Sequence, residues 1–297
     1  MIKLVTAVDA CKSAVQLSQH DKIMVLGSCF ADEIGRKMQA SGFDVCINPF
    51  GTLYNPVSLR MAVERLCSGR AFEPADCVEM GAGAGKICSF GHHTSFARTS
   101  ADEFLENANS SLADAAGFWA RCNKVIITLG TAYVWEHRDA GIVANCLKRD
   151  AREFIHYRLD TGRCVEELQR IVGLAPDKEF LFTVSPIRHM AQGAHENTLS
   201  KATLQLAVDQ LIACMPTTLA ADDKPRIAYF PAYEILCDEL RDYRFYGADL
   251  CHPSPLAVDI IWERFVQACV PAHEHAALLA AQKEYKRTQH RPLNGDN

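Results

Sequence analysis

The sequence lacks three features that mark common classes of protein. It contains no run of about 18 apolar residues, so no segment is predicted to span a membrane. It has no excess of positive charge, because 31 Lys and Arg face 36 Asp and Glu. Since the basic residues are also scattered, nucleic acid is not an expected partner. Residues 1–8 have no apolar segment or cleavage site of an export signal, which favours a cytoplasmic protein.

The 13 cysteines form no Cys-x-x-Cys pair. They lie at irregular intervals within apolar runs, which predicts reduced cysteines in the core instead of a disulfide framework. Their spacing also does not suit structural zinc. The sequence therefore gives no reason to expect a metal or another cofactor.

The composition is that of an ordinary globular protein, with 48% apolar and 23% charged residues in a chain of 297. Five short apolar segments bounded by turn residues predict strands, and helical patterns separate them. This alternation favours an α/β fold whose mainly parallel five-stranded sheet is covered on both faces. We predict strands at 23–26, 43–47, 124–129, 179–184 and 226–230, and helices at 31–40, 56–67, 101–122, 149–173 and 196–214.

Two regions do not follow the alternation. Residues 69–100 are interpreted as an excursion, that is, a segment outside the sheet, that helps to form a wall of the site. Their glycine-rich segment does not match a P-loop, because Met80 and Ile87 stand where that motif needs Gly and Ser or Thr. We expect one domain over 1–270 and a tail over 271–297, whose first half forms a surface helix and whose end is disordered.

One hydroxyl stands at the carboxyl end of the first predicted strand. Gly27 allows a sharp turn there, and Ser28 then begins a helix whose amides and dipole favour negative charge. Ser28 is predicted to be a nucleophile, and the alternative is that it only caps the helix. Cys29 is a weaker candidate nucleophile, since it is more simply interpreted as packing.

A possible partner for Ser28 lies more than 200 residues downstream. Asp249 stands three residues before His252, a spacing that lets a carboxylate orient an imidazole that accepts the serine proton. The alternative is a surface turn that Pro253 and Pro255 terminate. Serine, histidine and aspartate together indicate acyl-group chemistry.

Several motifs in this order resemble the GSCFA family, which takes its name from the residues found here at 27–31. That family is similar to the SGNH (GDSL-like) hydrolases, which implies a three-layer α/β/α sandwich. The resemblance spans about residues 20–265. The motifs are Gly27-Ser-Cys-Phe-Ala31, Asn48-Pro-Phe-Gly51-Thr-Leu-Tyr-Asn55-Pro, Thr128-Leu-Gly130, Ser185-Pro186 with Asn197-Thr-Leu-Ser200-Lys201, and Asp249-Leu-Cys-His252-Pro-Ser.

The resemblance makes Ser28 the nucleophile, His252 its base and Asp249 the residue that orients the imidazole. SGNH enzymes stabilise the oxyanion with the serine amide, a glycine and an asparagine, but Ala132 occupies the asparagine's place here. The expected oxyanion donors are the amides of Ser28 and Gly51, with the missing donor supplied by Asn48, Asn55, Asn197 or Thr131.

The segment after the fourth predicted strand carries polar side chains that can bind a carboxylate, a phosphate or a sugar hydroxyl. The candidates are Arg188, His189, His195, Asn197 and Lys201, and the alternative is an ordinary helix start with solvated charges. Tyr133 and Trp135 offer either a sugar-stacking surface or core packing, with core favoured for the tryptophan. His92 and His93 are weaker candidates for lining a cleft.

The predicted function is a serine-dependent ester hydrolase. A carbohydrate or glycoconjugate ester is the substrate class that the SGNH resemblance implies. Two alternatives stay open: an O-acyltransferase acting on sugar hydroxyls with the same three residues, and a catalytically silent protein that binds a carbohydrate or nucleotide.

Overall fold

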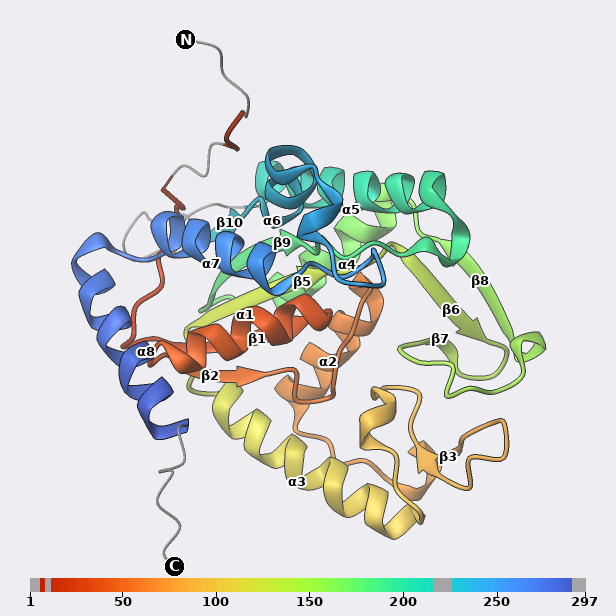
Figure 1. Cartoon of the computed structure of the whole chain (residues 1–297). Coiled ribbons are helices and arrows are strands. Elements are labelled where there is room, and N and C mark those ends of the chain that lie inside the picture. The colour runs from red at the N-terminus through yellow and green to blue at the C-terminus, as the bar shows by residue number, and fades with distance from the viewer. Residues whose placement is uncertain (1–5, 9–11, 216–225, 290–297) are drawn as a thin grey trace, which may run out of the picture.

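The computed structural model describes residues 6–8, 12–215 and 226–289. Its centre is a five-stranded parallel sheet with strand order β10-β9-β5-β1-β2. Helices cover both faces, so the chain forms an α/β fold of three layers (Figure 1). The predicted parallel five-stranded sheet is therefore confirmed. The chain leaves β1 for β2 on one side and then returns to β5 on the other, which makes the carboxyl ends of β1 and β5 the switch point where ligands bind in such sheets.

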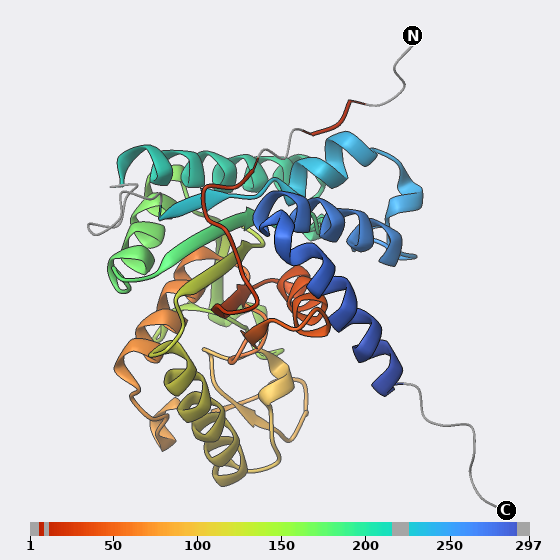
Figure 2. The same cartoon turned by 90° about the vertical axis from the view of Figure 1, so that its left-hand side faces the viewer.

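Side chains on the strands alternate between two separate cores. In β1, Met24 and Leu26 pack on the side of α2, α3, α4 and α5, while Ile23 and Val25 face α1 and α7. Figure 2 shows this arrangement, with α1, α7 and α8 on one side of the sheet and the other long helices on the opposite side. Because both faces are buried, each central strand is mainly apolar after its charged first residue. The bounds are β1 Lys22–Gly27, α1 Cys29–Ala40, β2 Asp44–Ile47, α2 Pro56–Ser68, α3 Ala101–Trp119, β5 Lys124–Leu129, α4 Thr161–Gly173, β9 Glu179–Val184, α5 Ala194–Cys214, β10 Ile227–Tyr229, α6 Ala232–Glu234, α7 Pro255–Cys269 and α8 His275–Gln289.

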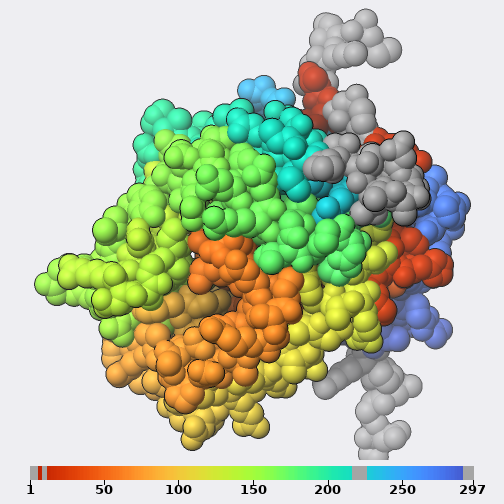
Figure 3. Space-filling model, turned by 180° about the vertical axis from the view of Figure 1, so that it is seen from behind, coloured from red at the N-terminus to blue at the C-terminus, as the bar shows by residue number. Residues whose placement is uncertain are grey.

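One predicted helix is partly wrong. Only its second half, α4, is helical, whereas Phe154–Arg158 forms strand β8. This strand pairs antiparallel with β6 (Tyr133–His137), which also pairs with β7 (Gly141–Val143). The resulting three-stranded sheet stands apart from the main sheet and was not predicted. It extends to the right in Figure 1 and, seen from behind, protrudes at the left margin of the space-filling view beyond α2 and α4 (Figure 3).

The excursion between α2 and α3 has little regular structure. It contains two short strands, β3 (Val78–Glu79) and β4 (Ile87–Cys88), which pair antiparallel. In the predicted tail, α8 packs beside α1 and α7, and residues 290–297 lie outside the described part of the chain. None of the described helices is long and apolar enough to cross a membrane.

Candidate functional site

The turn after β1 requires glycine. Gly27 has φ of +143°, and a Cβ there would lie 2.2 Å from the Thr128 carbonyl oxygen of β5. The Gly27 amide donates to Asn48 Oδ1 at 2.8 Å. Strand β1 therefore ends at a fixed place against β5, and Ser28 follows at the first position beyond it.

Ser28 does not cap α1 through its side chain. It occupies the N-cap position with extended backbone angles, yet its hydroxyl makes no capping hydrogen bond. The Oγ is buried and has no partner among the described residues. Leaving a buried hydroxyl unpaired costs about 1–3 kcal/mol, so such an atom calls for an explanation. The capping interpretation is wrong, and a role in ligand binding or chemistry stays open.

Asp249 and His252 form a close pair on the loop before α7. Asp249 Oδ2 lies 2.5 Å from His252 Nδ1, and Oδ1 accepts the amides of His252 and Cys251 at 3.0 Å each. These two amides and then the imidazole hold the pKa of Asp249 well below its ordinary value. The carboxylate therefore stays ionised and fixes the imidazole with Nε2 as its free nitrogen. Both side chains are about half exposed, at 51% and 53%.

The loop after β9 is joined to the loop that carries this pair. The Arg188 amide donates to the Cys251 carbonyl at 3.1 Å, and Arg188 Nη1 donates to the Leu250 carbonyl at 3.0 Å. The Arg188 guanidinium also lies against the rings of Tyr243 and Tyr246. Two segments that are distant in sequence are thus held together beside the end of β1.

Ser28 and His252 line one cavity of about 640 Å³ at the carboxyl edge of the sheet. This volume lies within the usual range for small-molecule sites. Ser28 Oγ makes no hydrogen bond to the imidazole, a common state before substrate binds. Of the other predicted site residues, the cavity receives Asn55, Thr131, Arg188 and His189, and also Cys29, Tyr133 and Trp135.

Two expected oxyanion donors are already engaged. The Gly51 amide donates to the Asn48 carbonyl at 2.8 Å, and Gly51 does not line the cavity. The Ser28 amide donates to the Thr128 carbonyl at 3.2 Å. The structure therefore does not support Gly51 as a donor, because the turn after β2 uses its amide internally.

Asn48 and Asn55 serve different purposes although both follow β2. Asn48 accepts from the Gly27 amide through Oδ1 and donates through Nδ2 to Asp32 at 2.6 Å, and it does not line the cavity. Asn55 accepts the Ser58 amide with Oδ1 at 2.9 Å and thereby caps α2. Its Nδ2 makes no hydrogen bond among the described residues. Asn55 lines the cavity beside Ser28, which leaves this NH₂ group as a donor for a ligand.

His189 is a second polar group without a partner in the same cavity. Its Nε2 is buried and makes no hydrogen bond within the described chain. Burial, and then the charges of Lys201 and His252, together lower the pKa of His189 to about 4. The imidazole is therefore neutral near pH 7. Its backbone amide is held by Asn197 Oδ1 at 2.8 Å.

Of the remaining predicted residues, Lys201 and Asn197 support the site without lining it. Lys201 is 1% exposed and donates to the carbonyls of Gly130 and Ser185, at 2.6 and 2.7 Å. It thus joins the ends of β5 and β9. Asn197 holds the loop after β9, as described above, and His195 is exposed outside the cavity. Thr131 lines the cavity, but its hydroxyl contacts Ser200 Oγ at 3.0 Å and its amide donates to the Tyr54 carbonyl.

The three-stranded sheet supplies a wall of aromatic rings that the sequence did not reveal. The His156 ring stacks on Trp135 with centroids 4.0 Å apart, and on Tyr133 at 4.9 Å. All three residues line the cavity and are partly exposed, so the core interpretation of Trp135 is wrong. The aromatic and β-branched residues Phe154, Ile155 and Tyr157 were the available signal for this strand. The cavity lining that was not predicted comprises Tyr54, Ala144, Asn145, Cys146, His156, Ile187, Met190, Ala191 and Gln192.

His92 does not line this cleft. It is fully buried, lies against Phe72 and Phe96, and has Nδ1 2.7 Å from Ser89 Oγ. Burial lowers the pKa of His92 to about 3, so it is a neutral residue of the core. Cys29, by contrast, lines the cavity, with Sγ 3.4 Å from the hydroxyl of Tyr54. Burial raises the pKa of Tyr54 to about 12.

The site lies at the carboxyl edge of a doubly wound parallel sheet. Its cavity is lined by a serine that follows the first strand and by the histidine of an Asp-His pair. The model of the GSCFA family matches residues 22–265, and the chain belongs to this family. Neither the curated proteins nor the solved structures yield a match to the chain. In the described ranges, no group of three or more His, Cys, Asp or Glu side chains is arranged to hold a metal ion.

Proposed function

We propose that this protein is a serine-dependent ester hydrolase that uses Ser28, His252 and Asp249. The observation that carries the proposal is the buried, unpartnered Ser28 Oγ in one cavity with an imidazole that an ionised carboxylate orients. A serine hydroxyl needs a neighbouring base to become a nucleophile, and His252 presents its free Nε2 for this purpose.

In the first half of the reaction, Ser28 Oγ bonds to the acyl carbon while its proton passes to His252 Nε2. The bond from carbon to the alcohol oxygen then breaks, and the imidazolium returns the proton to the departing alcohol. Water attacks the acyl-serine in the second half, with the same proton transfers. Asp249 stabilises the imidazolium formed in each half.

The negative charge that develops on the carbonyl oxygen needs donors that are already in place. Asn55 Nδ2 and the neutral His189 support such a role, because both residues line the cavity that Ser28 lines. Among the described residues, Asn55 Nδ2 makes no hydrogen bond and His189 Nε2 has no partner. In this proposal Asn55 replaces the asparagine whose expected place Ala132 occupies. A neutral imidazole can donate to an oxyanion without supplying a competing acid.

The alcohol part of the substrate is proposed to be a carbohydrate or glycoconjugate. Support comes from the aromatic wall of Tyr133, Trp135 and His156, together with the amide side chains of Asn145 and Gln192. This mixture of aromatic surface and hydrogen-bonding groups suits a ring that carries several hydroxyls. If a sugar hydroxyl replaces water as acceptor, the same residues perform O-acyl transfer.

The test is covalent labelling with a fluorophosphonate, followed by intact mass at neutral pH. We expect a single adduct on the wild type, none on Ser28→Ala and much slower labelling of His252→Ala. Cys29→Ala is the matched control, because the neighbouring thiol lines the same cavity and its loss leaves Ser28 labelling intact. A folded wild type that stays unlabelled refutes an activated serine and favours the silent binding protein. Labelling that persists in Ser28→Ala refutes the assignment of the nucleophile.

A further inference from the structure

A second cavity adjoins the one that holds Ser28. Its volume is about 240 Å³, and it shares Cys29, Ile187 and His252 with the larger cavity. An ester bound at Ser28 has two parts, the acyl chain and the alcohol. Two cavities that meet beside His252 therefore offer separate places for them.

The two cavities differ in chemistry. Around the imidazole, the smaller one is lined by the apolar side chains of Phe30, Ile187, Pro253, Pro255 and Val258. Three of these, Phe30, Ile187 and Val258, are also at least 95% buried members of the core between the sheet and α7, so they form a firm surface. Hydrocarbon gains free energy on such a surface in proportion to the area it buries, whereas a sugar ring would leave its hydroxyls unpaired there.

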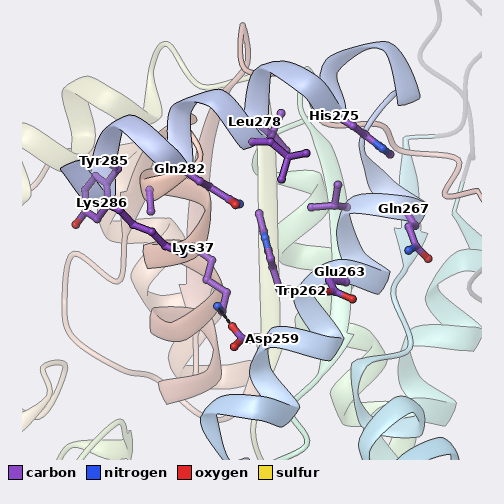
Figure 4. Close-up of a pocket in the computed structure, with 13 residues that line it drawn as sticks. Lys37, Asp259, Trp262, Glu263, Gln267, His275, Leu278, Gln282, Tyr285 and Lys286 are labelled. Carbon is purple, nitrogen blue, oxygen red and sulfur yellow. Dashed lines mark hydrogen bonds and ion pairs between the residues drawn. The ribbon is translucent and has the colours of Figure 1, made fainter. Parts of the chain in front are cut away.

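Three charged residues, Glu33, Lys37 and Asp259, also line this cavity, and the last two form an ion pair that borders a third space. Lys37 of α1 and Asp259 of α7 pair with each other, and both line a groove of about 490 Å³ between α7 and α8. Figure 4 shows this pair at the edge of the groove, whose other lining includes Trp262 and Leu278. The ion pair thus separates the apolar cavity from the groove.

We propose that the apolar cavity binds the acyl chain of the substrate, and that the Lys37–Asp259 pair limits the length of chain accepted. The chain is aliphatic and longer than acetyl. This inference rests on the ester hydrolase function proposed above, and it adds the class of acyl group.

The first test compares acetyl, butyryl, octanoyl and dodecanoyl esters of one alcohol. Each methylene that enters the cavity is expected to raise kcat/KM about fourfold, up to the length at which the chain reaches the ion pair. Pro255→Phe places a ring over the cavity at an exposed first position of α7, where proline is not required for the helix. It is expected to remove the preference for octanoyl, so that the ratio of kcat/KM for the octanoyl ester to that for the acetyl ester falls to about one.

Leu256→Phe is the matched control, because Leu256 is 55% exposed, neighbours Pro255 and lines neither cavity. It should behave as the wild type toward every chain length. Asp259→Ala removes the ion pair and is expected to shift the preferred chain from octanoyl toward dodecanoyl by opening the cavity into the groove. Equal rates for all chain lengths, or equal effects of Pro255→Phe and Leu256→Phe, overturn the acyl-chain site.

A binding measurement separates this inference from the proposed catalysis. Octanoate is titrated calorimetrically into Ser28→Ala, with and without Pro255→Phe. Binding that Pro255→Phe abolishes supports the acyl-chain site even if Ser28 does not react with a fluorophosphonate. Absence of octanoate binding to a protein whose wild type is labelled at Ser28 overturns the site and leaves the hydrolase standing.

Discussion

Lys201 provides a quantitative test of how the site is built. It is fully buried and donates to the carbonyls of Gly130 and Ser185 at the ends of β5 and β9, and it forms no ion pair with a carboxylate of the described residues. Burial lowers its pKa from 10.5 to about 7. At about 1.4 kcal/mol per pH unit, protonation is roughly 5 kcal/mol less favourable in the folded protein than in the unfolded chain.

This difference sets the pH dependence of stability. The unfolded chain keeps Lys201 protonated to about pH 10.5, whereas the folded protein releases the proton near pH 7. Unfolding therefore takes up a proton between these values, and the free energy of unfolding rises with pH across the window. Between pH 6 and 8, this one group is expected to add about 1.4 kcal/mol.

The assay is urea denaturation of the wild type and Lys201→Met at pH 6, 7 and 8. The substitution leaves two carbonyls without their donor, so its effect at a single pH is not decisive. The difference between the two proteins should grow by about 1.4 kcal/mol in favour of the wild type from pH 6 to 8. Buried thiols such as Cys46 and Cys164, whose pKa values burial raises to about 11 and about 12, act equally in both proteins. A difference that does not change with pH refutes a titrating Lys201.

Two further predictions concern the end of β1 and its neighbour. Gly27→Ala should lower the free energy of unfolding by several kcal/mol in urea denaturation, because the new Cβ would lie 2.2 Å from a backbone oxygen. A loss below about 0.5 kcal/mol would contradict the tight approach of β1 to β5. Asn55→Asp keeps the cap of α2 but removes the Nδ2 donor, so kcat should fall about 10²–10³-fold while the thermal midpoint stays near that of the wild type. Asn55→Ala removes both the cap and the donor, so both kcat and the thermal midpoint should fall. Equal activity of Asn55→Asp and the wild type would exclude Asn55 from the oxyanion site.

Sequence patterns predicted the main sheet well because its central strands β1, β5 and β9 are buried on both faces. Apolar runs such as 125–127 are typical of such strands. The segment 149–173 was misassigned because β8 has only five residues and is partly exposed, so it has no clear strand pattern of its own. The strong helical pattern of α4 was therefore extended over it. The aromatic wall depended on that strand, so His156 could not be placed beside Trp135.

The site was predictable to the extent that residues follow directly from strand ends. Ser28 lies one residue beyond β1, and its surroundings are set by the register of β1 with β5. Gly51 illustrates the limit: whether its amide is free depends on Asn48, whose positive φ closes a tight turn and makes its carbonyl the acceptor. A motif shows that a glycine is present but not where its N–H points.

The position of His252 depends on contacts that no local pattern encodes. Its loop is tied to the loop after β9 by Arg188, through the carbonyls of Leu250 and Cys251, and that loop is in turn held by Lys201 beneath Ser185. The buried lysine and the half-exposed imidazole are therefore parts of one support, which reaches from the sheet to the candidate base. Because the imidazole itself is half exposed, this support is what keeps it beside the cavity of Ser28.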